Sequence, residues 1–449
     1  MRRRTGFTSF LITTFLISLF AIGSLKAQVI LNSDSAFRVG TPNSGRVWGY
    51  VFGDFYYKGH SDSLNRGGAN QYTGIPQARN AFQFRRIYLG YDYNFNKHFS
   101  SELLLAAEDN FPAFNPPSST AASGDQLSNS KETFFIKLAN IRWKNVWNGT
   151  DLIIGEQTTP SFALMSEKIW NYRSIERTIT DIRRTPSYDM GAGLQGVFDP
   201  KSRNFGYDLL VATGNSDKPA ANSFKWFYGD IYGFFADKRL VIDLYADYER
   251  LNWQPGWHHD RQMLKGFVSY NTQIFTIGVE AYTNNIRADT KATYITPPGP
   301  YAADTINTKA TGISFFLHGD IVKNKLRYFA RVDTYNPNKN INTGTYSNYA
   351  ALSSPSGYGT TGYHLTYSAS TGAPTAATST GDITAKETFF TIGLDWTPYA
   401  DIHLEPNIWY NHYASQLTTT GPEGDHDLVY RLTFFFVFGK KYKNTYNQF

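Results

Sequence analysis

Cysteine is absent from the 449-residue chain. Disulfide bonds, thiolate metal sites and a lipoprotein anchor are therefore excluded, because each of them needs a cysteine. The chain also lacks a Pro/Gly-rich linker between regions of different pattern. A soluble chain of this length usually forms two or three domains, so the uniform pattern indicates one large domain instead.

Enzyme motifs are missing as well. The sequence contains no Gly-x-Ser-x-Gly elbow, no phosphate-cradling loop and no His-Glu-x-x-His. His258, His259 and Asp260 fall in an expected extracellular loop, where a solvated turn is favoured over a metal site because no third ligand is evident. Three further histidines are isolated in the sequence: His318, His403 and His412. We expect no catalytic residue, no metal and no cofactor.

The first 27 residues have the form of a secretory signal peptide. A basic start (MRRR) precedes an apolar stretch over 7–22, and Ala27 comes before a plausible cleavage site. Removal of this segment takes away three arginines, Lys26 and no acidic residue, so the formal net charge falls from +6 to +2. So small a charge removes the main support for nucleic-acid binding. We expect a signal peptide over 1–27 and one domain over 28–449.

What the chain does have is a repeated alternation of apolar and polar side chains. Because a bilayer cannot satisfy backbone polar groups, segments with this period can span it only as a closed β-barrel. Aromatic residues make up 16% of the chain, which is typical of the interfacial girdles of such barrels. Sixteen strands are predicted, near 46–57, 82–95, 98–108, 132–144, 150–157, 188–199, 204–214, 224–236, 238–250, 260–271, 273–285, 311–321, 324–335, 386–397, 400–412 and 427–438.

The links between these strands alternate between short and long. Asn96 and Lys97 join strands two and three, and Pro398 and Tyr399 join strands 14 and 15, as expected for tight periplasmic turns. The longer links are 58–81, 109–131, 158–187, 214–223, 251–259, 286–310, 336–385 and 413–426. Long loops at one rim and short turns at the other predict a barrel in the outer membrane of a Gram-negative bacterium.

Parity within each strand assigns the two faces. On the second strand Leu89 and Tyr91 lie opposite Arg86, Tyr88 and Asp92. A basic side chain at the lipid midplane costs about 2–4 kcal/mol, so the polar face must line the lumen. The basic wall candidates are Arg86, Lys137, Lys265, Arg331 and Arg431. More acidic residues than basic ones fall on the same face: Asp92, Glu102, Asp243, Asp247, Glu249, Glu280, Asp333 and Asp395.

Five segments resemble the phosphate-selective porin family (porins O and P), in a branch like that of the Bacteroidetes. They are 84–92 (FRRIYLGYD), 155–162 (GEQTTPSF), 172–177 (YRSIER), 189–193 (DMGAG) and 331–337 (RVDTYNP). The resemblance implies a sixteen-stranded, trimeric channel that favours small anions and contacts outer-membrane lipid. Family members commonly carry a lysine where this chain has Thr158 and Thr159, so the implication of phosphate selectivity is weaker than that of the fold.

The third long link, 158–187, is the strongest candidate site. In channels of this plan it folds into the lumen and narrows it. Its basic residues outnumber its acidic ones, with Lys168, Arg173, Arg177, Arg183 and Arg184 against Glu167, Glu176 and Asp181. Guanidinium groups suit the passage of anions because they are weakly hydrated, fork-shaped donors. The alternative is that Arg173, Glu176 and Arg177 are paired charges that fix the loop to the wall.

The sequence therefore predicts a passive channel for small hydrophilic solutes with a mild preference for anions. Two other classes stay open from the residues alone. One is an outer-membrane barrel enzyme whose catalytic residues come together from separate strands. The other is an adhesin that acts through the long extracellular loops.

Overall fold

The computed structural model describes residues 42–67, 70–108, 134–183, 186–215, 223–254, 257–299, 302–351, 384–417 and 423–439. The predicted signal peptide over 1–27 and the candidate Arg184 lie outside these residues.

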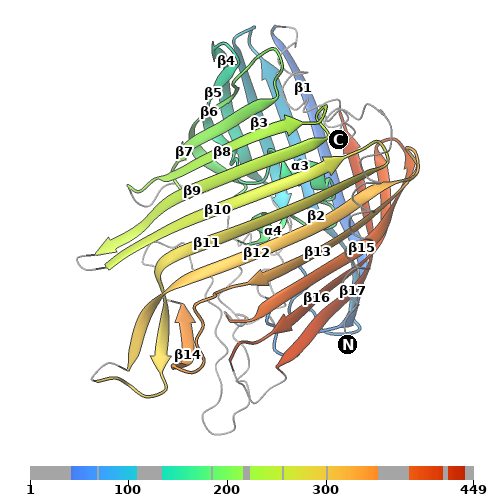
Figure 1. Cartoon of the computed structure of the whole chain (residues 1–449). Helices are drawn as coiled ribbons and strands as arrows, with labels where there is room; N and C mark the ends of the chain where they lie inside the picture. Colours follow the sequence, from blue (N-terminus) through green and yellow to red (C-terminus); the bar gives the residue numbers. More distant parts are fainter. Residues whose placement is uncertain are drawn as a thin grey trace, which may run out of the picture.

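A single antiparallel sheet closes on itself to form a barrel (Figure 1). Its strands are β1 (Ser44–His60), β2 (Asn80–Asn94), β3 (Phe99–Glu108), β4 (Phe135–Trp147), β5 (Thr150–Thr158), β6 (Tyr188–Val197), β7 (Phe205–Ala212), β8 (Trp226–Phe235), β9 (Leu240–Gln254), β10 (Trp257–Asn271), β11 (Phe275–Tyr294), β12 (Ala303–Val322), β13 (Leu326–Asn336), β14 (Tyr346–Ala351), β15 (Lys386–Tyr399), β16 (Ile402–Ala414) and β17 (Gly424–Phe438). Because β1 pairs with both β2 and β17, the ring has no open edge.

The barrel wall contains sixteen of these strands, as the sequence predicts. The exception is β14, which pairs with residues 290–294 of β11, beyond the part of β11 that pairs with β10. It lies within the predicted link 336–385. Together with the ends of β11 and β12 it forms an extension beside the rim that carries the long loops (Figure 1).

Two predicted loops prove to be mainly strand. The segment 251–259 is part of a hairpin in which β9 and β10 are separated by two residues. His259 and Asp260 therefore lie on β10 and not in a solvated turn. The predicted link 286–310 shortens to 295–302 because β11 and β12 continue beyond the rim. Alternation becomes irregular in these extensions, since neither face of them is set by lipid.

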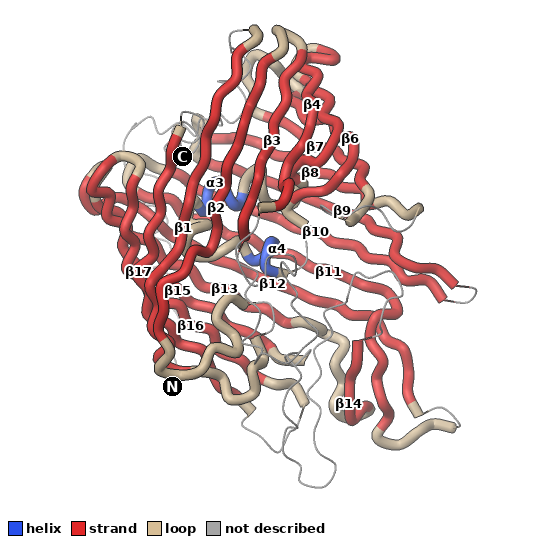
Figure 2. Tube along the Cα trace, turned by 180° about the vertical axis from the view of Figure 1, so that it is seen from behind, coloured by secondary structure: helices blue, strands red, loops and turns tan. Residues whose placement is uncertain are grey.

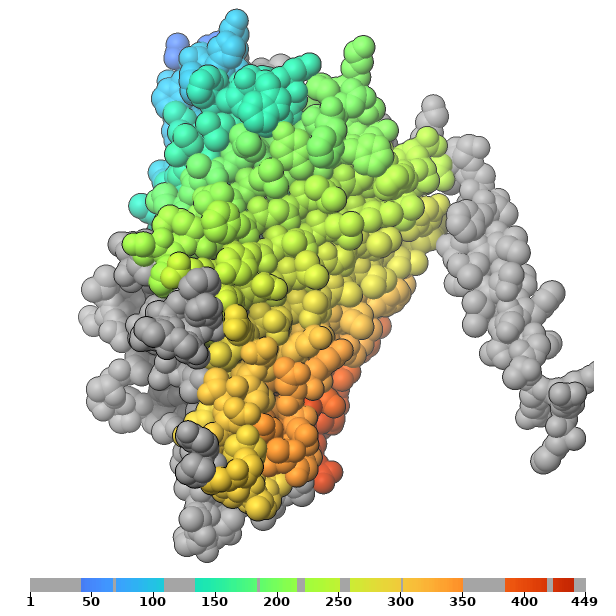
Figure 3. Space-filling model, turned by 60° about the vertical axis from the view of Figure 1, so that its left-hand side comes forward, coloured from blue at the N-terminus to red at the C-terminus, as the bar shows by residue number. Residues whose placement is uncertain are grey.

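The two faces of the wall follow the predicted parity. On β17, Tyr430 is 47% exposed on the outer side whereas Arg431 is 4% exposed on the inner side. The outer surface is a continuous wall from β4 to β13 (Figure 3), and exposed Leu, Ile, Val and Phe side chains cover it. None of the helices among the described residues is long and apolar enough to cross a membrane. The apolar outer face of the strands is the surface that contacts the bilayer.

The first and last strands meet at a seam, defined here as the pairing of β1 with β17. On its inner side the Nζ atom of Lys58 lies 2.6 Å from the Oδ1 atom of Asp427, and both side chains are buried. Lys58 also donates to the carbonyl oxygen of Tyr72 at 2.7 Å, and Asp427 accepts from the Tyr413 hydroxyl at 3.1 Å. Every charge in this pair is thereby hydrogen-bonded, as a buried pair requires.

We expect the Lys58→Met variant to lower the free energy of unfolding by about 3–5 kcal/mol, because Asp427 would stay buried without its partner. The measurement is urea unfolding of the barrel in lipid vesicles, followed by tryptophan fluorescence. Lys201→Met, at an exposed position in the turn between β6 and β7, is the control and should change the free energy by less than about 0.5 kcal/mol. Equal effects of the two variants would contradict a stabilising role for the pair.

Candidate functional site

The link from β5 to β6, residues 159–187, crosses the inside of the barrel and is called the lumen loop here. It carries α3 (Ser166–Trp170) and α4 (Ile179–Ile182), which lie inside the ring of strands in both opposite views (Figures 1 and 2). Asn171 ends α3 in the left-handed conformation at φ 62°, and Thr178 caps α4 by accepting from the amide of Asp181. These two caps produce the tight reversals that a loop confined in a lumen needs.

Apolar side chains of the lumen loop pack against one half of the wall. Ile169, Trp170 and Ile175 are buried against inward-facing residues of β8, β9, β10, β12 and β13: Phe234, Val241, Phe267, Phe316 and Phe329. Ile179 of α4 joins a second buried group that includes Trp226, Tyr228 and Tyr245. The inside of the barrel on this half is filled by side chains.

The wall also binds the loop through backbone carbonyl groups, and we call this arrangement the carbonyl anchor. Arg85 of β2 donates to the Ser174 carbonyl at 2.7 Å, and Arg431 of β17 donates to the Ile175 carbonyl at 3.1 Å. Arg331 of β13 donates to the Arg177 carbonyl at 2.6 Å and pairs with Asp333. Two of the predicted wall candidates, Arg331 and Arg431, therefore hold the loop in place.

Glu176 adds a charged contact to the carbonyl anchor. Its carboxylate accepts from Nε2 of Gln71 at 2.8 Å, from Nε1 of Trp409 at 2.9 Å and from the amide of Arg177 at 3.0 Å. Burial by itself would raise the pKa of this carboxyl, but Arg177, Arg85 and the Trp409 hydrogen bond outweigh it and hold the pKa below its usual range. The group is therefore ionised at neutral pH and fixed to the wall.

The opposite side of the loop faces a cluster of charges on β2, β3 and β4. On the wall, Arg86 lies 2.6 Å from Glu108, and Lys137 pairs with the same carboxylate. On the loop, Arg173 lies 2.7 Å from Asp181 and also pairs with Glu167. The charges of Arg86 and Lys137 act on Glu167 and Asp181 across the intervening space. We call these residues, together with Arg177, the charge cluster.

Sequence reasoning missed Arg85, which parity places on the lipid face. The register between β1 and β2 shifts so that Phe52 is opposite Arg86 and Gly53 is opposite Phe84. Arg85 is the extra residue of this β-bulge, and a bulge can turn two consecutive side chains to one side. Both Arg85 and Arg86 consequently point into the lumen. Two adjacent arginines in an otherwise alternating strand are the sequence feature that could have revealed this bulge.

The remaining candidates lie away from the charge cluster. Lys168 is half-buried on α3, and Lys265 is buried against Asp243 on the packed half of the wall at 2.8 Å. Arg183 pairs with Glu387 and lies over the Tyr335 ring, 4.4 Å from its centre. Of the predicted residues, the structure brings Arg86, Lys137, Arg173 and Arg177 together in the charge cluster. The others lie elsewhere in the barrel, and Arg184 lies outside the described residues.

A small pocket lies between the lumen loop and the wall. Arg183 lines it together with Glu176, Asp333 and Glu387. The carboxylates outnumber the guanidinium group, so the pocket does not offer a site for an anion.

Two of the histidines expected to be isolated, His318 and His403, have partners. His318 bonds to the carbonyl oxygen of Ile169 at 2.8 Å and lies 3.2 Å from an Arg327 nitrogen, which fits a neutral ring that donates from Nε2 and accepts at Nδ1. His403 lies 2.8 Å from Asp395. His259, in the segment expected to be a solvated turn, is buried with Asp289 at 3.2 Å. These contacts cross between strands, so sequence spacing could not reveal them.

Comparison with solved structures finds the same fold at low sequence identity. The chain is similar to the outer membrane channel DcaP of Acinetobacter baumannii, with 11% identity, a TM-score of 0.54, and coverage of 88% of this chain and 98% of that one. It is also similar to OmpT of Vibrio cholerae, with 10% identity, a TM-score of 0.50, and coverage of 89% and 99%. A third similar structure is Salmonella typhi OmpF in complex with daunomycin, with 10% identity, a TM-score of 0.50, and coverage of 91% and 99%.

At these identities the likeness establishes the fold alone, and no family model and no curated protein matches the sequence. The resemblance to porins is thereby supported for the general porin fold and not for the phosphate-selective family. The closed ring with an apolar outer face places the chain in the outer membrane of a Gram-negative bacterium, as predicted.

We expect Glu176→Gln to loosen the lumen loop without unfolding the barrel. The amide would replace an ionised acceptor of three hydrogen bonds, and each hydrogen bond to a charged group contributes about 1.5–3 kcal/mol. The measurement is hydrogen exchange by mass spectrometry of the segment 171–182 in the folded barrel. Glu423→Gln, in the exposed link before β17, is the matched control. If exchange in the segment were the same in both variants, the carbonyl anchor alone would hold the loop.

Proposed function

We propose that the chain is a porin, a passive channel of the outer membrane for small hydrophilic solutes. The observation that carries the proposal is a charged loop held inside a closed barrel by contacts with β2, β13, β16 and β17. A loop fixed in this way narrows a lumen permanently, which suits size-limited diffusion. The similarity to a structure described as an outer membrane channel supports a channel over the barrel enzyme.

We further propose a mild preference for anions, with Arg177 as the residue that decides its sign. On the wall side of the charge cluster, Arg86 and Lys137 share one carboxylate, that of Glu108. On the loop side, Arg173 lies between two carboxylates, those of Glu167 and Asp181. The wall side carries a net charge of +1 and the loop side a net charge of −1, so the two cancel. Arg177 adds one positive charge beside the carboxylate of Glu176, on which Arg85 and Arg431 also act.

Arg177 is available to passing ions. Its side chain is 21% exposed, and its Nε atom lies 3.9 Å from the Glu176 carboxylate, which already accepts from Gln71 and Trp409. Field lines concentrate at the narrowest part of a low-dielectric pore, so a single charge there can outweigh acidic residues on a wide wall.

The resemblance to phosphate-selective porins extends this proposal in three ways. Phosphate-like anions are candidate solutes, although Thr158 and Thr159 replace the usual lysine. The working assembly would be a homotrimer, which native mass spectrometry of the detergent-extracted protein can test. The mature chain would begin after residue 27, and N-terminal sequencing of the outer-membrane form can test that boundary.

Planar-bilayer recording tests the channel itself. The purified barrel should give stepwise conductance with weak or no rectification. A folded, heat-modifiable barrel without any conductance would contradict the porin proposal and favour an enzyme or an adhesin.

We expect Arg173→Ala/Arg177→Ala to reduce the preference for anions. A unit charge at 4 Å contributes about 1 kcal/mol in water-like surroundings, which corresponds to a change of about five-fold in local ion concentration. The measurement is the zero-current potential in a salt gradient, and the ratio of anion to cation permeability should fall about five-fold or more. The matched control is Lys201→Ala/Lys323→Ala, at two exposed positions in short turns. A cation-selective wild type, or equal potentials in the two double variants, would contradict the role of the loop arginines.

A further inference from the structure

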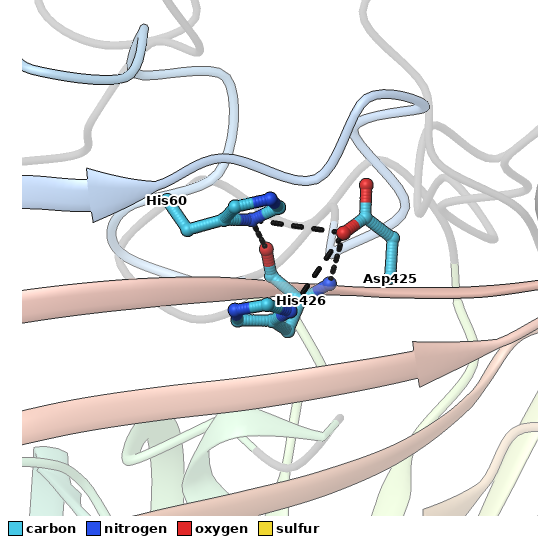
Figure 4. A group of neighbouring side chains, drawn as sticks. All are labelled: His60, Asp425 and His426. Atoms are coloured by element: carbon cyan, nitrogen blue, oxygen red, sulfur yellow. Dashed lines mark hydrogen bonds and ion pairs between the residues drawn. The ribbon is translucent and has the colours of Figure 1, made fainter.

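The outer side of the seam carries a group of side chains with no part in the proposed channel. His60 is the last residue of β1, and Asp425 and His426 begin β17, at the end of the barrel that carries the long loops. The two imidazole rings are stacked, with centres 4.0 Å apart and planes inclined by 10° (Figure 4). The Asp425 carboxylate lies beside both rings (Figure 4).

A β-bulge brings His60 to this face. The register of the seam shifts between Lys58 and His60, so that Lys58 is opposite Val429 and His60 is opposite Leu428. Residues directly opposite each other share a face, and Leu428 has the parity of the exposed Tyr430. His60 and His426 therefore both lie on the outer face at the loop-bearing rim, where solvent can reach them.

The distances fit a metal ion of the zinc class. The Nδ1 atom of His60 lies 3.6 Å from Oδ1 of Asp425, and the Nδ1 atom of His426 lies 3.7 Å from the same oxygen. Ligand atoms held at 2.0–2.2 Å around a tetrahedral zinc ion are roughly 3.3–3.5 Å apart. The two contacts to the carboxylate therefore need to close by only a few tenths of an ångström, and all three donors lie within 4.8 Å of one another. The two rings must turn out of their stacked arrangement for both Nδ1 lone pairs to point at one ion.

The carboxylate is already oriented for this role. Its Oδ2 atom accepts from the amide of Ser63 at 2.9 Å, and its Oδ1 atom accepts from the amide of His426 at 2.8 Å. Such outer contacts fix a ligand before a metal arrives. The Nδ1 atom of His60 bonds to the carbonyl oxygen of His426 at 2.7 Å, and zinc would displace the proton of that bond. The side chains are 35%, 17% and 33% exposed for His60, Asp425 and His426, which leaves a path of entry.

We propose that His60, Asp425 and His426 form a divalent transition-metal site that fastens the first strand of the barrel to the last at its extracellular rim. The imidazole and carboxylate donors suit zinc, copper or nickel. A ligand set from residues so far apart in sequence exists only in the closed barrel, so a bound metal stabilises that form by mass action. His412 is the cross-strand partner of His426 and provides a further imidazole beside the site.

The test uses the full-length mature barrel in detergent, purified without a histidine tag and treated with chelator. Zinc is the probe, titrated by isothermal calorimetry. We expect one zinc ion per chain and an increase in the temperature at which the folded form converts to the unfolded form on SDS gels. Loss of an outer-shell partner alone costs about 10–100-fold in metal affinity, so His60→Ala and His426→Ala should each weaken binding at least ten-fold and abolish the increase.

The matched control is His98→Ala, at an exposed position in the turn between β2 and β3 on the opposite rim, which should bind zinc as the wild type does. Each variant is first shown to run as a folded barrel in unheated SDS without zinc. Asp425→Asn, which keeps the size of the side chain, repeats the measurement if an alanine variant fails to fold. Wild-type affinity in the folded His60→Ala and His426→Ala variants would overturn the proposal, as would a wild type that binds no zinc at millimolar concentration.

Discussion

The lumen of this barrel depends on the carbonyl anchor. A loop inside a barrel exposes backbone carbonyl groups that cannot pair within a strand ladder, and burying them without donors would cost about 1–3 kcal/mol for each. Arg85, Arg431 and Arg331 supply donors from three separate strands, and Trp170 supplies one to the carbonyl of Glu176 at 2.8 Å. The four carbonyls of residues 174–177 are satisfied in this way, which allows the loop to cross the lumen in a single conformation.

This use of arginine changes how the charges of the lumen must be interpreted. Arg331 and Arg431 are committed to loop carbonyls and to their neighbours Asp333 and Asn407, and Lys265 is committed to Asp243. A count of lumen charges therefore says little about the field that an ion meets. What remains is the charge cluster on one side of the loop, where the balance of wall and loop charges is close to neutral. Because the positive and negative charges of this cluster nearly cancel, a single residue can decide the sign of the ion selectivity. The selectivity must therefore be mild.

Much of the fold could be predicted from the sequence, and the failures have physical causes. The ring of sixteen strands and the faces of β2, β9 and β17 follow from alternation, because lipid on one side and water on the other enforce a period of two. Beyond the rim that constraint ends, so the extensions of β11 and β12 and the added strand β14 escaped prediction. The place of Arg85 depends on a bulge of one residue, which shifts parity without leaving a gap in the pattern.

The candidate site could also be predicted only in part: the sequence indicates which residues are charged but not which charges pair across strands. Sequence composition identified a basic lumen loop, and Arg173 and Arg177 do act on the carboxylate of Asp181 together with Arg86 and Lys137 of the wall. The partner of each wall charge, however, comes from another strand, since Arg86 and Lys137 both pair with Glu108. Pairing across a closed ring depends on strand tilt and register that no local pattern encodes. The seam is the clearest example of such non-local contacts. Lys58 pairs with Asp427 on its inner side, and the rings of His60 and His426 stack on its outer side. Two residues on either side of a bulge in the first strand thus find partners on the last strand. The closure of the ring creates these contacts, so they cannot be predicted from the sequence, and they in turn stabilise the closed ring.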